Sequence, residues 1–97
     1  MKYFAVTYTY GQDTQLVNDT RPTHREWIKE QIAAGSVIAA GPFTDGGGEA
    51  LLIIRQPDEA TQADVEALLN QDPYNVAGAL ASFDIRPWNA VANTFED

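Results

Sequence analysis

The hydrophobic pattern of this 97-residue chain switches between period two and helical spacing in a fixed order, which restricts its fold more than any single motif does. We expect, in chain order, a strand over 2–10, a helix from Thr20 or Thr23 to Gly35, strands over 37–43 and 50–55, a helix over 57–70 and a strand over 80–88. This βαββαβ order predicts an α+β, ferredoxin-like protomer, whose antiparallel sheet carries both helices on one face.

Local signals set the expected limits of the first helix. The polar segment 11–19 is typical of a loop, and Pro22 suits the first turn of a helix. Thr23 and Glu26 have the spacing of a capping box, and Gly35 is a typical C-terminal stop. A short extra helical turn is expected after Asp72, where Pro73 follows.

Size and charge limit the classes of function. The length predicts a single domain over 1–97, with a hydrophobic fraction of 44% that suffices for one core. A net charge of -8 argues against nucleic acid and anionic membranes as partners. One sheet face is left uncovered in a small domain, so we expect a homodimer. The chain has no recognisable secretory signal or membrane-spanning stretch, which predicts a cytoplasmic location.

His24 is the sole histidine, and cysteine is absent. Imidazole is the side chain that titrates near neutral pH without a large perturbation, so His24 is the natural acid-base candidate. Helical spacing places His24, Ile28 and Ile32 on one stripe facing the sheet, with Arg25 on the outer face. Two interpretations remain open: a catalytic imidazole, or a half-buried structural histidine bonded to a carbonyl.

Asp72 also has two interpretations. Before Pro73 it suits the N-cap of a short helix, and its carboxylate could instead accept a hydrogen bond from His24 and fix the imidazole tautomer. The two helices run roughly parallel in this fold. Contact with His24 therefore requires the loop carrying Asp72 to fold back, or a site formed across subunits.

Other residues are candidates for binding a small-molecule substrate. Arg21 could hold an anionic group or pair with surface carboxylates, and Gly41 with Pro42 forms either a ligand contact or a bend. Tyr74 and Trp88 could form a pocket wall, or belong to the core or a dimer interface. A single histidine without cysteine predicts no metal site, and we expect no cofactor.

Short motifs along nearly the whole chain resemble those of the YCII-related (YciI-like) family. The matching segments are Arg21-Pro22-x-His24, Gly35 at the helix end, Ala40-Gly41-Pro42, Asp72-Pro73-Tyr74 with Ala77-Gly78, and Ile85-Arg86-Pro87-Trp88. The loop after Pro42 is shorter than the segment that many members insert there.

The resemblance implies a dimeric α+β barrel of ferredoxin-like protomers, with a His–Asp active site at His24 and Asp72. It also implies kinship with dehydrochlorinases of chlorinated hydroxyhydroquinones and, in fold, with muconolactone isomerases. Because the hairpin loop could border the pocket and is short in this chain, the substrates of other family members cannot be assigned to it.

These observations predict a small cofactor-independent enzyme. His24 would perform general acid-base chemistry, with Asp72 orienting it, in an isomerisation, elimination or dehydrohalogenation of a small cyclic or aromatic molecule. The alternative is a non-catalytic, dimeric ligand-binding or accessory domain with a structural His24. A third hypothesis for the function is a cofactor-free barrel of the monooxygenase type.

Overall fold

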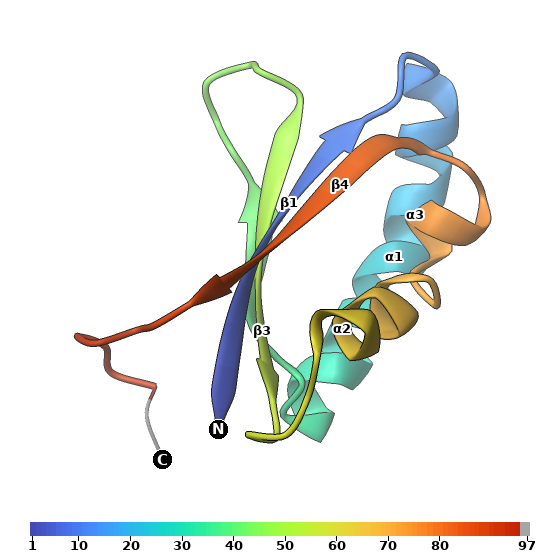
Figure 1. The fold of residues 1–97 in the computed structure, drawn as a ribbon. Coiled ribbons are helices and arrows are strands. Elements are labelled where there is room, and N and C mark those ends of the chain that lie inside the picture. The colour runs from blue at the N-terminus through green and yellow to red at the C-terminus, as the bar shows by residue number, and fades with distance from the viewer. Residues whose placement is uncertain (96–97) are drawn as a thin grey trace.

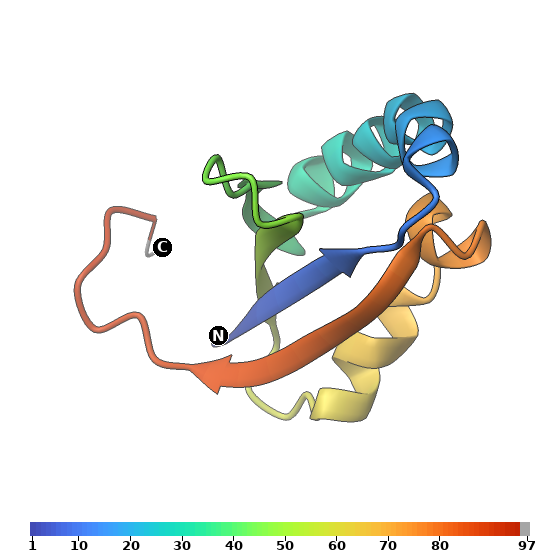
Figure 2. The ribbon, with the colours of Figure 1, turned by 90° about the horizontal axis from the view of Figure 1, so that it is seen from above.

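The structure is a computed structural model that describes residues 1–95, and it consists of one four-stranded antiparallel sheet with all helices on one side (Figures 1 and 2). The elements are β1 (Lys2–Tyr10), α1 (Thr14–Ala34), β2 (Val37–Pro42), β3 (Glu49–Gln56), α2 (Gln62–Leu69), α3 (Pro73–Val76) and β4 (Leu80–Trp88). The strand order β2-β3-β1-β4 confirms the predicted ferredoxin-like topology. No helix in this described part combines the length and apolar character of a membrane span.

The first helix begins earlier than the sequence predicted. Asp13 is its N-cap, and the Asp13 carboxylate accepts a hydrogen bond from the Leu16 amide at 3.1 Å. Pro22 therefore lies inside α1, and the expected loop over 11–19 and the capping box at Thr23 are wrong. Val17 is buried, and this burial stabilises the additional turns against the cost of an interior proline.

The end of α1 and the hairpin follow the prediction. Gly35 has φ of 83° and ends the helix, a conformation that glycine adopts without the steric penalty of a Cβ. The second helix, in contrast, begins at Gln62 and not at residue 57. Thr61 and Asp64 form its capping box, while Ala60 donates to the Pro57 carbonyl in a preceding turn.

The core lies between the helices and the sheet. Phe4, Val6 and Tyr8 point from β1 into it, as the alternation predicted. The sequence predicts Ile38 as a core residue of β2, but Val37 is the buried residue there, because a register shift after Val37 changes the alternation against β3.

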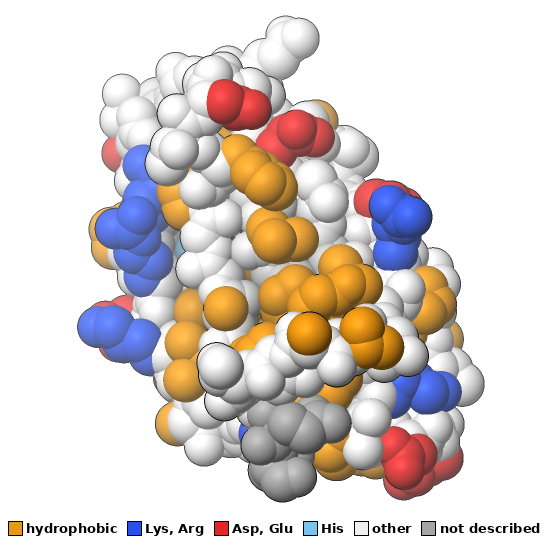
Figure 3. Space-filling model, turned by 90° about the vertical axis from the view of Figure 1, so that its left-hand side faces the viewer, with side chains coloured by type: hydrophobic (Ala, Val, Ile, Leu, Met, Phe, Trp, Pro, Cys, Tyr) orange, Lys and Arg blue, Asp and Glu red, His pale blue; other side chains and the backbone are white. Residues whose placement is uncertain are grey.

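The opposite face of the sheet has no helix over it, and hydrophobic side chains gather there (Figure 3). Leu51 and Phe43 are among the exposed large hydrophobic residues. The segment after β4 turns back, and the Phe95 ring packs on Tyr3 and Trp88 with centroids 5.5 and 6.5 Å apart. Most of this sheet face therefore remains open to solvent.

Candidate active site

Asp72 is a fully buried carboxylate that three hydrogen-bond donors surround. Its Oδ1 accepts from the Tyr74 amide at 3.0 Å and contacts His24 Nδ1 at 2.8 Å. Its Oδ2 accepts from the Tyr8 hydroxyl at 2.8 Å and lies 3.0 Å from the same imidazole nitrogen. Asp72 thus caps α3 and also contacts His24. The donors satisfy a charge that would otherwise be costly to bury.

The position of α3 explains how this contact forms within one chain. α2 ends at Leu69, and the Asp72 amide donates to the Leu69 carbonyl at 3.0 Å. The loop thus folds back directly, and α3 packs against the first half of α1 (Figure 1). No second subunit is required to bring Asp72 to His24.

His24 is held on two sides. Because the Asp72 carboxylate only accepts, Nδ1 must carry the proton that it donates to Asp72. The Tyr74 ring stacks on the imidazole with centroids 4.0 Å apart and an interplanar angle of 19°. Nε2 has no hydrogen-bond partner among residues 1–95 and is not buried. The ring is therefore fixed in one orientation, with a free lone pair on Nε2.

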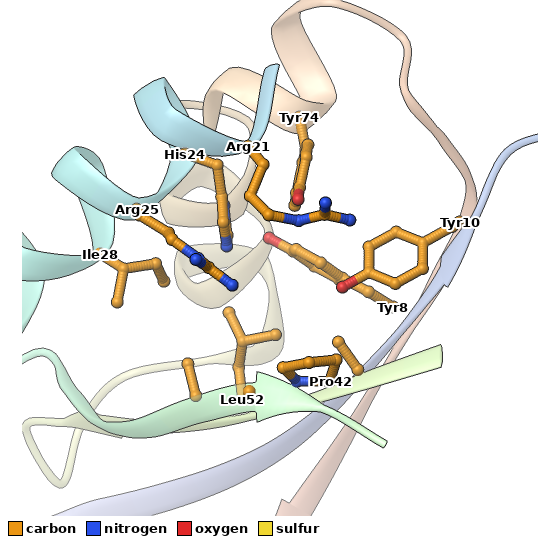
Figure 4. A pocket seen from close by; sticks show the side chains of 12 residues that line it. Tyr8, Tyr10, Arg21, His24, Arg25, Ile28, Pro42, Leu52 and Tyr74 are labelled. Atoms are coloured by element: carbon orange, nitrogen blue, oxygen red, sulfur yellow. The ribbon is translucent and has the colours of Figure 1, made fainter. Parts of the chain in front are cut away.

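The imidazole borders a cavity of about 120 Å³ between α1, α3 and the sheet (Figure 4). Its lining residues are Tyr8, Tyr10, Arg21, His24, Arg25, Ile28, Ala40, Gly41, Pro42, Ala50, Leu52 and Tyr74. For comparison, an engineered apolar cavity of roughly 150 Å³ holds benzene. The size therefore suits a small ring, with part of the ligand at the open mouth.

Four of the five proposed binding residues meet at this cavity. Arg21 lines it from α1, Gly41 and Pro42 from β2, and Tyr74 from α3. Trp88 does not line it: Trp88 pairs with Tyr3 at the far end of β1 and is 41% exposed. Sequence order could not reveal this separation, because it depends on the register between β1 and β4.

Three polar cavity residues were missed as site residues. Period-two alternation places Tyr8 on the same face of β1 as Phe4 and Val6, although nothing local indicates that its hydroxyl meets Asp72. Tyr10 lies one pleat further on the same side of β1. Arg25 is exposed, as its predicted place on the outer face of the helix implies, but its guanidinium also reaches the cavity (Figure 4). On the predicted stripe of His24, Ile28 and Ile32, the last residue does not belong to the core, because Ile32 is 48% exposed.

Burial raises the pKa of two of the three cavity tyrosines, Tyr8 and Tyr10. Desolvation, reinforced by the Asp72 carboxylate, strongly raises the pKa of Tyr8, so its hydroxyl stays a donor. Desolvation and the adjacent Tyr74 also raise the pKa of Tyr10, against the opposing effect of Arg21 and Arg25. Both tyrosines are therefore neutral hydrogen-bonding groups at physiological pH.

Carboxylates and the imidazole do not gather into a metal site in the part of the chain that the structure describes. Among residues 1–95, no three His, Asp or Glu side chains are grouped as metal ligands. The cavity wall itself contributes His24, two arginines and three tyrosines as polar groups.

Comparison with known proteins gives the family. A model of the YCII-related domain matches residues 1–89. The chain belongs to the YCII-related domain family. The predicted family resemblance is thus confirmed, and the match covers every element that positions His24 and Asp72. A search of curated proteins gives no significant match.

A solved structure with a similar fold is the 5-chloro-2-hydroxyhydroquinone dehydrochlorinase (TftG) from Burkholderia phenoliruptrix AC1100, in complex with 2,5-dihydroxybenzoquinone. The superposition has a TM-score of 0.74 and covers 90% of this chain and 93% of that chain, at 18% sequence identity. At this identity the likeness establishes a common fold.

The hydrogen bond from Tyr8 to Asp72 predicts a dependence of stability on alkaline pH. In the folded protein Tyr8 keeps its proton above pH 10.0, the ordinary pKa of a tyrosine hydroxyl, whereas the unfolded chain releases that proton there. The folded state then binds more protons, so the free energy of unfolding falls by up to ~1.4 kcal/mol per pH unit above that value.

Tyr8→Phe removes this contribution, and its stability curve should fall less steeply than that of wild type between about pH 10 and 11. Urea unfolding across that range measures the difference. Tyr10 titrates in both proteins and therefore cancels from the comparison. Parallel curves would show that the Tyr8 hydroxyl is not held as described.

Proposed function

We propose that this chain is a small, cofactor-independent enzyme in which His24 performs general acid-base chemistry on a small cyclic or aromatic molecule. The observation that supports this most directly is the orientation of the imidazole. Nδ1 donates to the buried Asp72, while Nε2 is unpaired among the described residues at a ring-sized cavity. A merely structural histidine gains nothing from this exposed lone pair.

In the proposed reaction, Nε2 removes a proton from a carbon or hydroxyl of the bound ring. The imidazolium that forms is stabilised by the Asp72 carboxylate, which also keeps the ring in its orientation. In an isomerisation, the electron pair shifts within the ring system and Nε2 returns the proton at another atom. In an elimination or dehydrohalogenation, the pair forms a new double bond and the leaving group departs with its bonding electrons.

The common fold with a dehydrochlorinase supports this class of chemistry over redox or group transfer. That neighbour acts on a chlorinated hydroxyhydroquinone and is seen with 2,5-dihydroxybenzoquinone. Hydroxylated quinones, hydroquinones and lactones are accordingly the first compounds to test. The rival function is ligand binding without turnover, with His24 serving to hold α1 against α3.

Substitution at His24 and Asp72 tests the proposal. Small hydroxylated rings and lactones are incubated in D₂O, and deuterium incorporation or product formation is followed by NMR. We expect His24→Gln to lower the rate by ~10²–10⁴-fold, the usual contribution of a general base. Asp72→Asn should also lower it, because the imidazole loses its orienting acceptor.

Asp45→Asn is the matched control, since it removes the same charge from an exposed turn residue whose carboxylate, among residues 1–95, accepts a hydrogen bond from the Gly47 amide alone. It should leave the rate unchanged. Turnover that persists in His24→Gln, or no exchange by wild type with any compound, would favour the ligand-binding alternative.

We also propose that two copies pair through the open sheet faces. The uncovered face carries the exposed apolar residues Leu51, Phe43 and Trp88, a patch that water contacts unfavourably in a monomer. Pairing would bury it and close a barrel, as the family resemblance implies.

Sedimentation equilibrium is expected to give a dimer at micromolar concentration. Leu51→Glu should shift the population towards monomer, because it places a charge in the apolar interface, while Asp45→Asn should not. A monomer at all concentrations in wild type would contradict the pairing.

A further inference from the structure

The cavity is positively charged in a strongly acidic protein. The chain has six Lys and Arg residues against fourteen Asp and Glu, yet Arg21 and Arg25 both line this one cavity. None of the described residues lining it is an aspartate or glutamate. Asp72 lies behind His24, where three donors already satisfy it. The charge at the cavity mouth is therefore opposite to that of the whole molecule.

The backbone of α1 sets this arrangement. Arg21 and Arg25 are four residues apart and so lie on one stripe, one turn from each other. Figure 4 shows their side chains reaching from α1 towards the sheet, on either side of His24. The hydroxyl of Tyr10 is near enough to sense both guanidinium groups. Two cations and a neutral hydroxyl thus face one space.

Neither guanidinium has an anionic partner within residues 1–95. Arg21 donates to the neutral side chain of Asn18 at 2.8 Å, and Arg25 forms no ion pair there. Two like charges at i and i+4 destabilise a helix slightly, so this pair does not serve folding. An anion held between them would relieve the repulsion.

We propose that the cavity binds its ligand as an anion: a small ring bearing a carboxylate or an ionised ring hydroxyl, with the negative oxygen between Arg21 and Arg25. This deepens the proposed function, on which it rests, by assigning the charge of the substrate. Planar guanidinium groups match such oxygens and form charge-assisted hydrogen bonds with them. The ring would then lie against Leu52 and Pro42, within reach of His24 Nε2.

The same pair would assist the reaction. When Nε2 removes a proton from the ring, negative charge develops on the conjugated oxygen. Arg21 and Arg25 are already placed to compensate that charge without reorganisation. Arg25 is consequently a substrate-binding residue of this chain, and its role differs from that of His24: it selects ligand charge, whereas His24 moves the proton.

Binding measurements test the inference without requiring turnover. ¹⁵N-labelled protein is titrated with benzoate, with its neutral isostere benzamide, and with 4-nitrophenolate at a pH where the phenol is ionised. We expect saturable shifts at the cavity for at least one anion, and at least tenfold weaker binding of benzamide. Which anion binds more tightly distinguishes a carboxylate from an ionised hydroxyl. Affinity for the anion should also fall as salt is added.

Arg25→Gln and Arg21→Gln should each weaken anion binding about tenfold, which corresponds to ~1.4 kcal/mol, and leave benzamide binding unchanged. Arg86→Gln is the matched control, because it removes the same charge from an exposed position on β4. Its affinity should equal that of wild type.

Equal binding of benzamide and benzoate, equal effects of Arg25→Gln and Arg86→Gln, or no saturable binding of either anion would each overturn the inference. The two proposals fail separately. If His24→Gln retains turnover while the arginine variants lose anion binding, the proposed chemistry is wrong and the anion site stands.

Discussion

The buried carboxylate of Asp72 is the group on which the rest of the site depends. An ionised carboxylate without partners is among the costliest groups to bury, so its three donors must be in place together. These donors come from β1, α1 and α3. A single side chain thereby ties the sheet to two helices that are distant in sequence, and the same contacts position His24.

This arrangement also explains why the cavity has two different chemical sides. Behind His24, Asp72 and Tyr8 form a closed network that fixes a proton on Nδ1 and leaves Nε2 unpaired among the described residues. In front of it, Arg21 and Arg25 supply positive charge with no acidic neighbour on the cavity wall. A base beside cationic groups suits proton removal from an acidic ring, since the product anion is stabilised where it forms.

The sequence predicted those features that depend on local patterns. Alternation located β1, two apolar runs around a glycine-rich turn located the β2–β3 hairpin, and Gly35 marked the end of α1. The start of α1 was missed because Pro22 matches a first-turn position as well as it matches the interior position that it occupies. The inward residue of β2 was missed because a register shift cannot be read from composition.

For the site, the family resemblance indicated His24 and Asp72, and helical spacing placed His24 towards the sheet. The path that joins them could not be predicted, because it depends on α3 folding back after α2. Helical spacing placed Arg25 on the outer face of α1. Spacing alone does not show that so long a side chain can reach around the helix to the cavity. Trp88 was assigned to the pocket because aromatic residues indicate burial without indicating where.

The measurement that tests the account most directly is the tautomer of His24, read from its ¹⁵N chemical shifts at a pH where the imidazole is neutral. In wild type, Nδ1 should carry the proton and Nε2 should show the shift of an unprotonated nitrogen. In Asp72→Asn, the amide oxygen continues to cap α3 and the amide nitrogen donates to Nδ1, so the proton should move to Nε2. An Nε2-protonated ring in wild type, or the same tautomer in both proteins, would contradict the account.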